Sequence, residues 1–175
     1  AYEISTRDWS SDVCSSDLTN FYNLNMVKDI IGELQQKYNV KFLIIANTDP
    51  LLTGVKYEYR KWQLESEIED LLQIHIGIMP LENSEIELGK CGFKAIQYMS
   101  LGIPAVVSPV GANKDVEENG KTGFWVNNAS EWREKLELLI NDESLRSEMG
   151  KKGREKMMSE YSVESNKEKF FSIFR

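Results

Sequence analysis

The segment GKCGFKAIQYMSLGIPAVV, residues 89–107, contains the pattern that decides the fold. It opens with a glycine loop and continues into a helix predicted over residues 92–101. Gly102 is expected to end this helix, and Pro104 to open a buried strand over residues 105–108. A loop, a helix and an apolar strand in this order make one unit of an α/β sheet.

The same alternation continues on both sides of this segment. The strands are short and continuously apolar, which is typical of strands that helices cover on both faces. We therefore predict a Rossmann-like, doubly wound parallel sheet with helices on both faces, in which ligands bind beyond the carboxyl ends of the strands. Further strands are predicted over residues 40–46, 74–79 and 123–126, and helices over residues 23–38, 65–73, 128–141, 142–161 and around Phe170, Phe171 and Phe174.

Three of these helices carry more detailed expectations. In the helix over residues 65–73, Ile68, Leu71 and Leu72 are expected to point inward. Asn128 and Glu131 resemble a capping box at the start of the next. The helix over residues 142–161 is expected to break at its two internal glycines, Gly150 and Gly153.

Residues 8–18 differ from the rest of the chain. Their sequence, DWSSDVCSSDL, has neither a strand nor a helix period, and it is identical to a translation of a common sequencing adapter. We interpret residues 1–18 as an artefact or a disordered tail, and residues 19–175 as the domain. The sheet is then expected to lack its first strand, which would precede the helix at Asn23.

Composition excludes several classes. A formal net charge of −7 disfavours a general role in binding nucleic acid, and no apolar run approaches the ~20 residues that span a bilayer. Cys14 and Cys91 are distant and lack metal-ligand or disulfide spacing, so we expect no metal site and a cytoplasmic location.

Two predicted strands end in loops suited to an anion. The loop over residues 81–91 opens a helix, whose first N–H groups and positive dipole end face any ligand there. Lys90 and Lys94 add positive charge suited to a diphosphate. Gly111 and Asn113 follow the next strand and also enter a helical turn, so two neighbouring strand ends would form a nucleotide site. A structural turn with no ligand is the alternative.

The order of these residues resembles a known family. Residues 89–107 are similar to the pattern Gly-Lys-x-x-x-Lys-x-x-Glu-Tyr-Met-Ala-x-Gly-x-Pro-Val-Val of group 1 glycosyltransferases with the GT-B fold. Residues 110–124 resemble the Gly-Gly-x-x-Glu…Gly-x-x-Gly segment that follows it there, and residues 145–162 the C-terminal helices. The resemblance covers residues 22–174 and identifies the chain as the nucleotide-sugar-binding C-terminal half.

The resemblance implies a donor site with two departures. The family frames its donor with a Glu-x7-Glu pair, and these positions hold Gly89 and Gln97. Gln97 can still hydrogen-bond a ribose hydroxyl, whereas Gly89 offers only its backbone. Glu85 and Glu87 lie close enough in sequence to supply a carboxylate instead. The donor-binding residues implied are Gly89, Lys90, Gly92, Phe93, Lys94, Gln97, Gly111 and Asn113.

The mechanism implied is electrostatic. Helix N-termini and cations stabilise the negative charge on the departing nucleoside diphosphate, with no metal and no cofactor besides the nucleotide-sugar donor. The catalytic groups are not identified, because the acceptor-binding half is expected to be missing. The parent is expected to be a retaining, hexosyl-type enzyme of polysaccharide biosynthesis without a transmembrane segment, open to peripheral membrane association, and the fragment alone to be inactive.

Two alternatives stay open at this point. A nucleotide-sugar epimerase shares the fold, although few His or carboxylate pairs occur in the strand-end loops. A non-catalytic domain that binds a nucleotide or a partner would explain the lost Glu pair.

Overall fold

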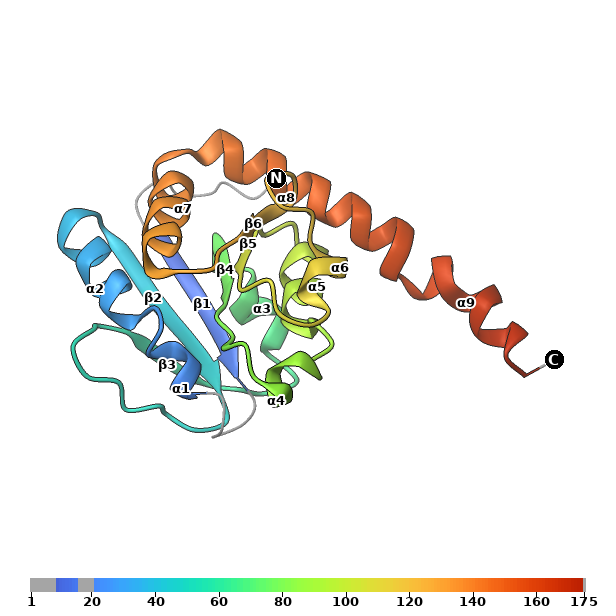
Figure 1. Ribbon diagram of the computed structural model, residues 1–175, viewed down its shortest axis with the longest axis horizontal. Helices are drawn as coiled ribbons and strands as arrows, with labels where there is room; N and C mark the ends of the chain where they lie inside the picture. The colour runs from blue at the N-terminus through green and yellow to red at the C-terminus, as the bar shows by residue number, and fades with distance from the viewer. Residues whose placement is uncertain (1–8, 16–20, 175) are drawn as a thin grey trace.

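The computed structural model describes residues 9–15 and 21–174. In this part of the chain, six parallel strands form one sheet in the order β3-β2-β1-β4-β5-β6 (Figure 1). The predicted parallel sheet is confirmed, and its order reverses direction between β1 and β4, which is the topological switch point. The strands are β1 (Trp9–Ser15), β2 (Val40–Ala46), β3 (Glu58–Lys61), β4 (Ile76–Met79), β5 (Ala105–Val107) and β6 (Gly123–Trp125).

The expectation that the first strand is missing is wrong. β1 lies between β2 and β4, and it pairs with β2 from Trp9 opposite Val40 to Ser15 opposite Ala46. Ladder hydrogen bonds come from backbone groups that every non-proline residue carries, so an extended segment without a hydrophobic pattern can fill the space between two strands. The remainder of the expected tail, residues 1–8 and 16–18, lies outside the described residues.

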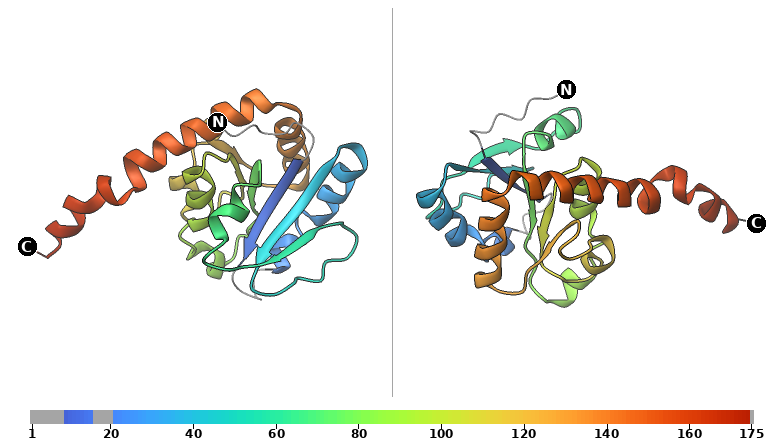
Figure 2. Two further views of the ribbon diagram at one scale, coloured as in Figure 1. Left: turned by 180° about the vertical axis from the view of Figure 1, so that it is seen from behind. Right: turned by 90° about the horizontal axis from the view of Figure 1, so that it is seen from above.

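Helices cover both faces of the sheet, as Figure 2 shows from two further sides. One face carries α1, α2 and α7, and the other carries α3 and α5. Among the described helices, none is both long and apolar enough to cross a bilayer. The helices are α1 (Phe21–Leu24), α2 (Lys28–Lys37), α3 (Glu67–Leu71), α4 (Glu85–Leu88), α5 (Phe93–Ser100), α6 (Asn113–Val116), α7 (Ala129–Asn141), α8 (Glu143–Lys156), the π-helical turn η2 (Met157–Tyr161) and α9 (Val163–Ser172).

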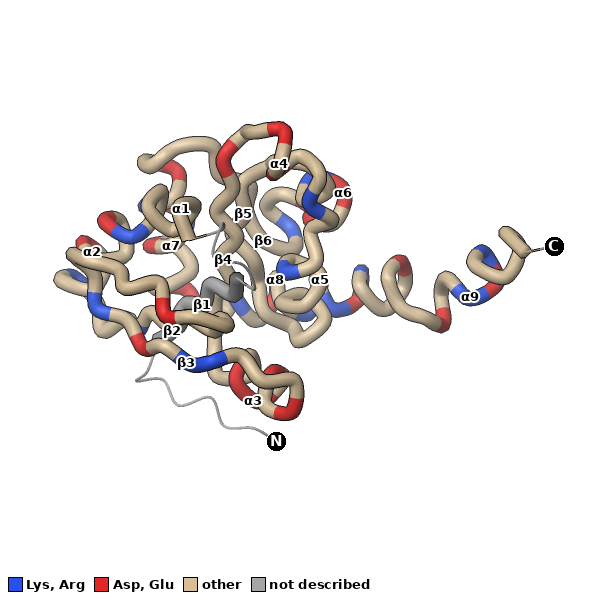
Figure 3. Tube along the Cα trace, turned by 90° about the horizontal axis from the view of Figure 1, so that it is seen from below, with Lys and Arg blue, Asp and Glu red and all other residues tan. Residues whose placement is uncertain are grey.

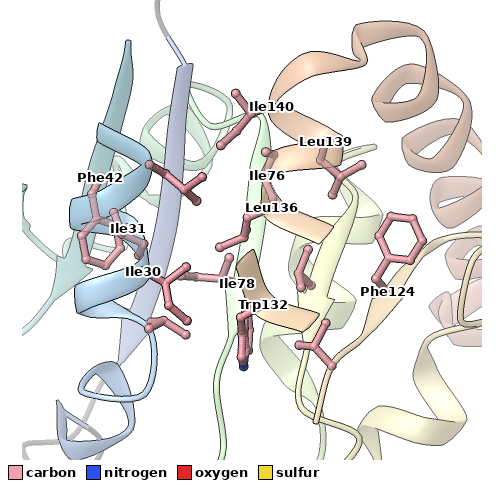
Figure 4. Packing of buried hydrophobic residues seen from close by; sticks show 14 of the residues in the cluster. Ile30, Ile31, Phe42, Ile76, Ile78, Phe124, Trp132, Leu136, Leu139 and Ile140 are labelled. Carbon is pink, nitrogen blue, oxygen red and sulfur yellow. The ribbon is translucent and has the colours of Figure 1, made fainter. Parts of the chain in front are cut away.

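The apolar strands feed two separate cores. In β2, Phe42 and Ile44 pack toward α2 and α7, whereas Leu43 and Ile45 pack toward α3 and α5. Figure 4 shows the first core, in which Trp132 and its neighbours on α7 meet the sheet. Burial on both faces explains why these strands have no polar alternation.

The structure corrects two details of the predicted helices. Only Leu71 of the three apolar side chains on α3 is buried, while Ile68 and Leu72 are exposed. This helix is five residues long, too short to bury a wide stripe.

α8 also continues without a break through Gly150 and Gly153, and the irregular π-helical turn follows it. A Cβ at Gly150 would lie 1.9 Å from the carbonyl oxygen of Gly102, so this glycine lets α8 approach the turn after α5. Close backbone approach, and not a helix stop, accounts for it.

The predicted cap by Asn128 is confirmed, and the reciprocal bond to Glu131 comes from the backbone of Asn127, one residue before the cap. Asn128 caps α7 by accepting from the backbone N–H of Glu131, and the Glu131 side chain accepts from Asn127 and Asn128. Trp132, Leu136 and Leu139 are buried on this helix as expected.

Candidate functional site

The loops that follow β4 and β5 are held together at the carboxyl edge of the sheet. The backbone N–H of Ser108 donates to Met79 O at 3.1 Å, and the backbone N–H of Leu81 donates to the Ser108 hydroxyl at 3.0 Å. Both loops therefore leave the sheet side by side, next to the switch point at which open α/β sheets bind ligands.

Two glycines with positive φ allow these loops to pack closely. Gly92 (φ +69°) precedes α5, and a Cβ there would lie 3.2 Å from Asn113 Oδ1. Gly111 (φ +54°) lies against the other loop, where a Cβ would come 2.8 Å from Leu88 O. The structure thus brings together predicted residues of both loops, and the positive φ at both positions favours glycine.

The N-terminus of α5 is open. The eight-residue helix begins after Gly92, and no side chain caps it. Its first-turn N–H groups, beginning at Phe93, therefore point out of the helix end without a capping acceptor. Such a helix end favours an anion through its free donors and its dipole.

The charge at this helix end comes from two lysines with different surroundings. Lys94 lies in the first turn of α5, is half-buried, and forms no ion pair with any described residue. Lys90 pairs with Glu87, its Nζ lying 2.5 Å from Glu87 Oε2. Lys94 therefore keeps its full charge for a ligand, whereas that of Lys90 is partly neutralised. Figure 3 shows acidic positions on α3 and around α4, at opposite ends of this view.

Glu87 is the centre of a buried polar cluster. Its carboxylate is 1% exposed and accepts from the Tyr22 hydroxyl at 2.5 Å and from Asn23 Nδ2 at 3.1 Å. Burial raises the pKa of this carboxyl, but Lys90, Tyr22 and Asn23 outweigh it, so the pKa lies below its usual value. Asn23 also accepts from the backbone N–H of Glu82 at 3.0 Å. Glu87 thus ties α1 to the loop and is not available as a replacement for the lost donor carboxylate, while Glu85 is exposed.

Asn113 lies behind the loop. It is 1% exposed, its Nδ2 donates to Ser108 O at 2.9 Å, and its Oδ1 has no hydrogen-bond partner among the described residues. Its burial favours a role in supporting Gly92, and a direct donor contact stays a prediction. Gly89 and Phe93 are exposed at the surface of the same loop.

Gln97 contacts an element that the sequence did not connect to it. Its Nε2 donates to Glu67 Oε1 at 3.1 Å, and Trp62 Nε1 donates to the same oxygen at 2.8 Å. Trp62 follows the carboxyl end of β3, and Glu67 opens α3. No local pattern along the chain connects Trp62 or Glu67 to Gln97, because 30 residues separate Glu67 from Gln97.

No group of three His, Cys, Asp or Glu is placed to hold a metal ion in residues 21–174, whose side chains the structure describes. The described site therefore consists of backbone N–H groups, glycines, two lysines and the Trp62–Glu67–Gln97 cluster. Such groups can bind an anion together with hydroxyl groups, at the edge of a doubly wound sheet.

Comparisons with known proteins point to one family. Residues 18–156 match the family described as glycosyl transferases group 1. The capsular polysaccharide biosynthesis glycosyltransferase CapM of Staphylococcus aureus is 34% identical over 85 residues, which are 47% of this chain and 22% of CapM.

Solved structures share the fold. TarM of S. aureus, in a complex with fondaparinux, alpha-GlcNAc-glycerol and UDP, has a TM-score of 0.74 and 21% identity, covering 100% of this chain and 37% of TarM. The C-terminal domain of the group 1 glycosyl transferase LpcC from Francisella tularensis has a TM-score of 0.65 and 15% identity, covering 88% of this chain and 86% of that domain.

The chain therefore spans about a fifth of CapM and just over a third of TarM. The family match covers most of the chain and contains both strand-end loops of the site. This chain belongs to the group 1 glycosyltransferases.

Proposed function

We propose that this chain is the donor-binding domain of a glycosyltransferase that moves a sugar from a nucleoside-diphosphate sugar to an acceptor. The observation that carries the proposal is the uncapped N-terminus of α5, with Gly92 before it and the unpaired Lys94 in its first turn. TarM was solved with UDP, and HepE of Anabaena with UDP-glucose, which supports a nucleotide-sugar as the donor. The family match favours sugar transfer over the epimerase alternative.

In this proposal each group has a specific role. As the bond between the sugar and the diphosphate breaks, negative charge grows on the departing phosphate oxygens. The α5 N–H groups and Lys94 stabilise this charge without forming a covalent bond to the sugar. Glu87 holds Lys90 beside the same loop.

The proposal extends to the intact protein. Its acceptor-binding half would supply the acceptor site and the remaining cations, so this chain alone would bind a donor weakly and not turn over. The likeness to CapM supports polysaccharide biosynthesis, and the family resemblance supports retention of anomeric configuration and a cytoplasmic reaction. The family match over residues 18–156 supports assigning most of the domain, and β1 (Trp9–Ser15), which lies within the same sheet, is part of it.

Calorimetric titration of the full 175-residue chain with UDP, GDP, UDP-glucose and GDP-mannose tests the proposal. Saturable binding of one nucleotide is expected. Lys94→Ala should weaken it about tenfold, since a charge-assisted hydrogen bond contributes roughly 1.5 kcal/mol.

Lys151→Ala is the matched control, because Lys151 is an exposed lysine on α8, away from the α5 N-terminus. It should leave the affinity unchanged. A folded chain that binds none of the four compounds would overturn the proposal, as would equal losses in the two variants.

A further inference from the structure

The cluster of Trp62, Glu67 and Gln97 places a carboxylate next to the proposed phosphate site. Lys94 and Gln97 are three residues apart on α5, so they lie on one face of the helix, about one turn from each other. Glu67 lies one hydrogen bond beyond Gln97, from the neighbouring helix α3. A ligand with its diphosphate at the α5 N-terminus would therefore have its adjoining group within reach of Glu67.

The contacts orient this carboxylate. Trp62 and Gln97 both donate to Oε1 of Glu67, from the end of β3 and from α5. Among the described residues, none donates to Oε2. Glu67 is half-buried, so one oxygen is fixed by the protein while the other stays open at the edge of the sheet.

The identity of Gln97 agrees with this arrangement. An amide at position 97 donates to Glu67, whereas a second carboxylate about 3 Å away would repel it. Trp62 is partly buried against the core on the α3 and α5 side, which anchors its indole. The three side chains thus form a hydrogen-bond-accepting site whose negative charge is the Glu67 carboxylate on α3.

We propose that Glu67 is a specificity-determining residue that accepts hydrogen bonds from the ribose hydroxyls of the nucleoside diphosphate. A carboxylate at a strand-end loop beside a phosphate site accepts well from a ribose diol, and a 2′,3′-dideoxyribose has neither of these hydroxyls to donate. This inference rests on the proposed function, since it places the ribose beside a diphosphate bound at α5.

The test compares ribonucleotides with their deoxy counterparts. UDP and GDP, and 2′,3′-dideoxy-UDP and 2′,3′-dideoxy-GDP, are titrated into the full chain, into Glu67→Gln and into the control Glu69→Gln. Glu69 is an exposed carboxylate on the same helix. Wild type should prefer the ribonucleotide. Glu67→Gln should weaken ribonucleotide binding about tenfold and change dideoxynucleotide binding less than twofold, and Glu69→Gln should match wild type.

Trp62→Phe provides a second variant if Glu67→Gln does not fold. It keeps an aromatic ring but removes the donor that orients Oε1, so the preference for the ribonucleotide should fall by a smaller factor. Equal weakening of both nucleotide types, or no change in the preference in either variant, would show that Glu67 only joins α3 to α5 and would overturn the inference. Wild type that binds ribo- and dideoxynucleotides equally would also overturn it and leave the proposed function standing. Wild type that binds neither would overturn both.

Discussion

At the scale of single residues, Glu117 stands out as a buried acid without a partner. It is 1% exposed, and neither carboxylate oxygen has a hydrogen-bond partner among the described residues. A Cβ at Gly123 would lie 1.9 Å from its Oε1, so the carboxyl occupies the space that this glycine leaves open on β6. Burial raises the pKa of Glu117 well above its ordinary value, and Lys156 only partly opposes this.

This raised pKa predicts how stability depends on pH. The folded state binds the Glu117 proton more tightly than the unfolded state, so its contribution is fullest below the unfolded value of 4.5 and is lost as pH rises toward the folded pKa. Over that window the free energy of unfolding should fall by up to about 1.4 kcal/mol per pH unit. Glu117→Gln should lack this dependence and be more stable than wild type at pH 7, as measured by urea unfolding between pH 4 and pH 8.

Glu118, the next residue, serves as a control, because its contribution to stability changes with pH in the opposite direction. Its hydrogen bond to Lys121 is the main reason that its pKa lies below the usual value, so its contribution is present above the unfolded pKa and lost as pH falls. Glu118→Gln should therefore not gain stability at pH 7. Identical pH profiles for wild type and Glu117→Gln would contradict the assignment of a raised pKa to Glu117.

At the scale of elements, α8 depends on a glycine for its contact with the end of α5. Alanine in a helix interior normally stabilises by about 1 kcal/mol relative to glycine. At Gly150, however, the added methyl would collide with Gly102 O, and overpacking typically costs about 1–3 kcal/mol. Gly150→Ala should therefore lower the free energy of unfolding in chemical denaturation.

Ser147→Ala is the control on the same helix. Ser147 is exposed, so this substitution changes the helix propensity and leaves the packing unchanged. It should be neutral or slightly stabilising. If Gly150→Ala were as stable as Ser147→Ala, α8 would not approach the α5 turn as closely as the structure shows.

The last element, α9, has a different character. It projects from the body of the molecule and has no buried residue, with Phe170 forming edge-to-face contacts with Phe171 and Phe174 (Figure 1). The spacing of the phenylalanines predicted a helix here, but it did not predict that their side chains would be exposed.

At the scale of the whole molecule, β1 joins the two halves of the sheet. It pairs with β2 on one side and β4 on the other. The chain lacking residues 1–18 would leave a gap with two unpaired strand edges, which template aggregation. We expect this shorter chain to lose cooperative thermal unfolding and to elute as aggregates in size-exclusion chromatography.

The chain lacking only residues 1–8 is the control, since it keeps β1. It should unfold at the temperature of the full chain. A monomeric, cooperatively unfolding chain without residues 1–18 would mean that β1 is dispensable, and it would favour the interpretation of these residues as an artefact.

Local chemistry allowed the strand, helix and loops of the candidate site to be predicted. The strand at Val40–Ala46 was predicted to the residue, and the glycine loop, the helix after it and the loop at Gly111 all have local signals in turn residues and apolar periods. The two loops lie together because both follow adjacent parallel strands, a consequence of the alternating pattern.

The sequence by itself therefore determined the class of fold, the two glycine loops at the strand ends and the family resemblance, since each depends on residues close along the chain. Only the tertiary structure decided the parts that depend on distant residues. It placed β1 in the sheet through backbone pairing, committed Glu87 to Tyr22 and Asn23, and joined Glu67 to Gln97. Such contacts have no signature along the chain, because they form only when packing brings separate elements within hydrogen-bond distance.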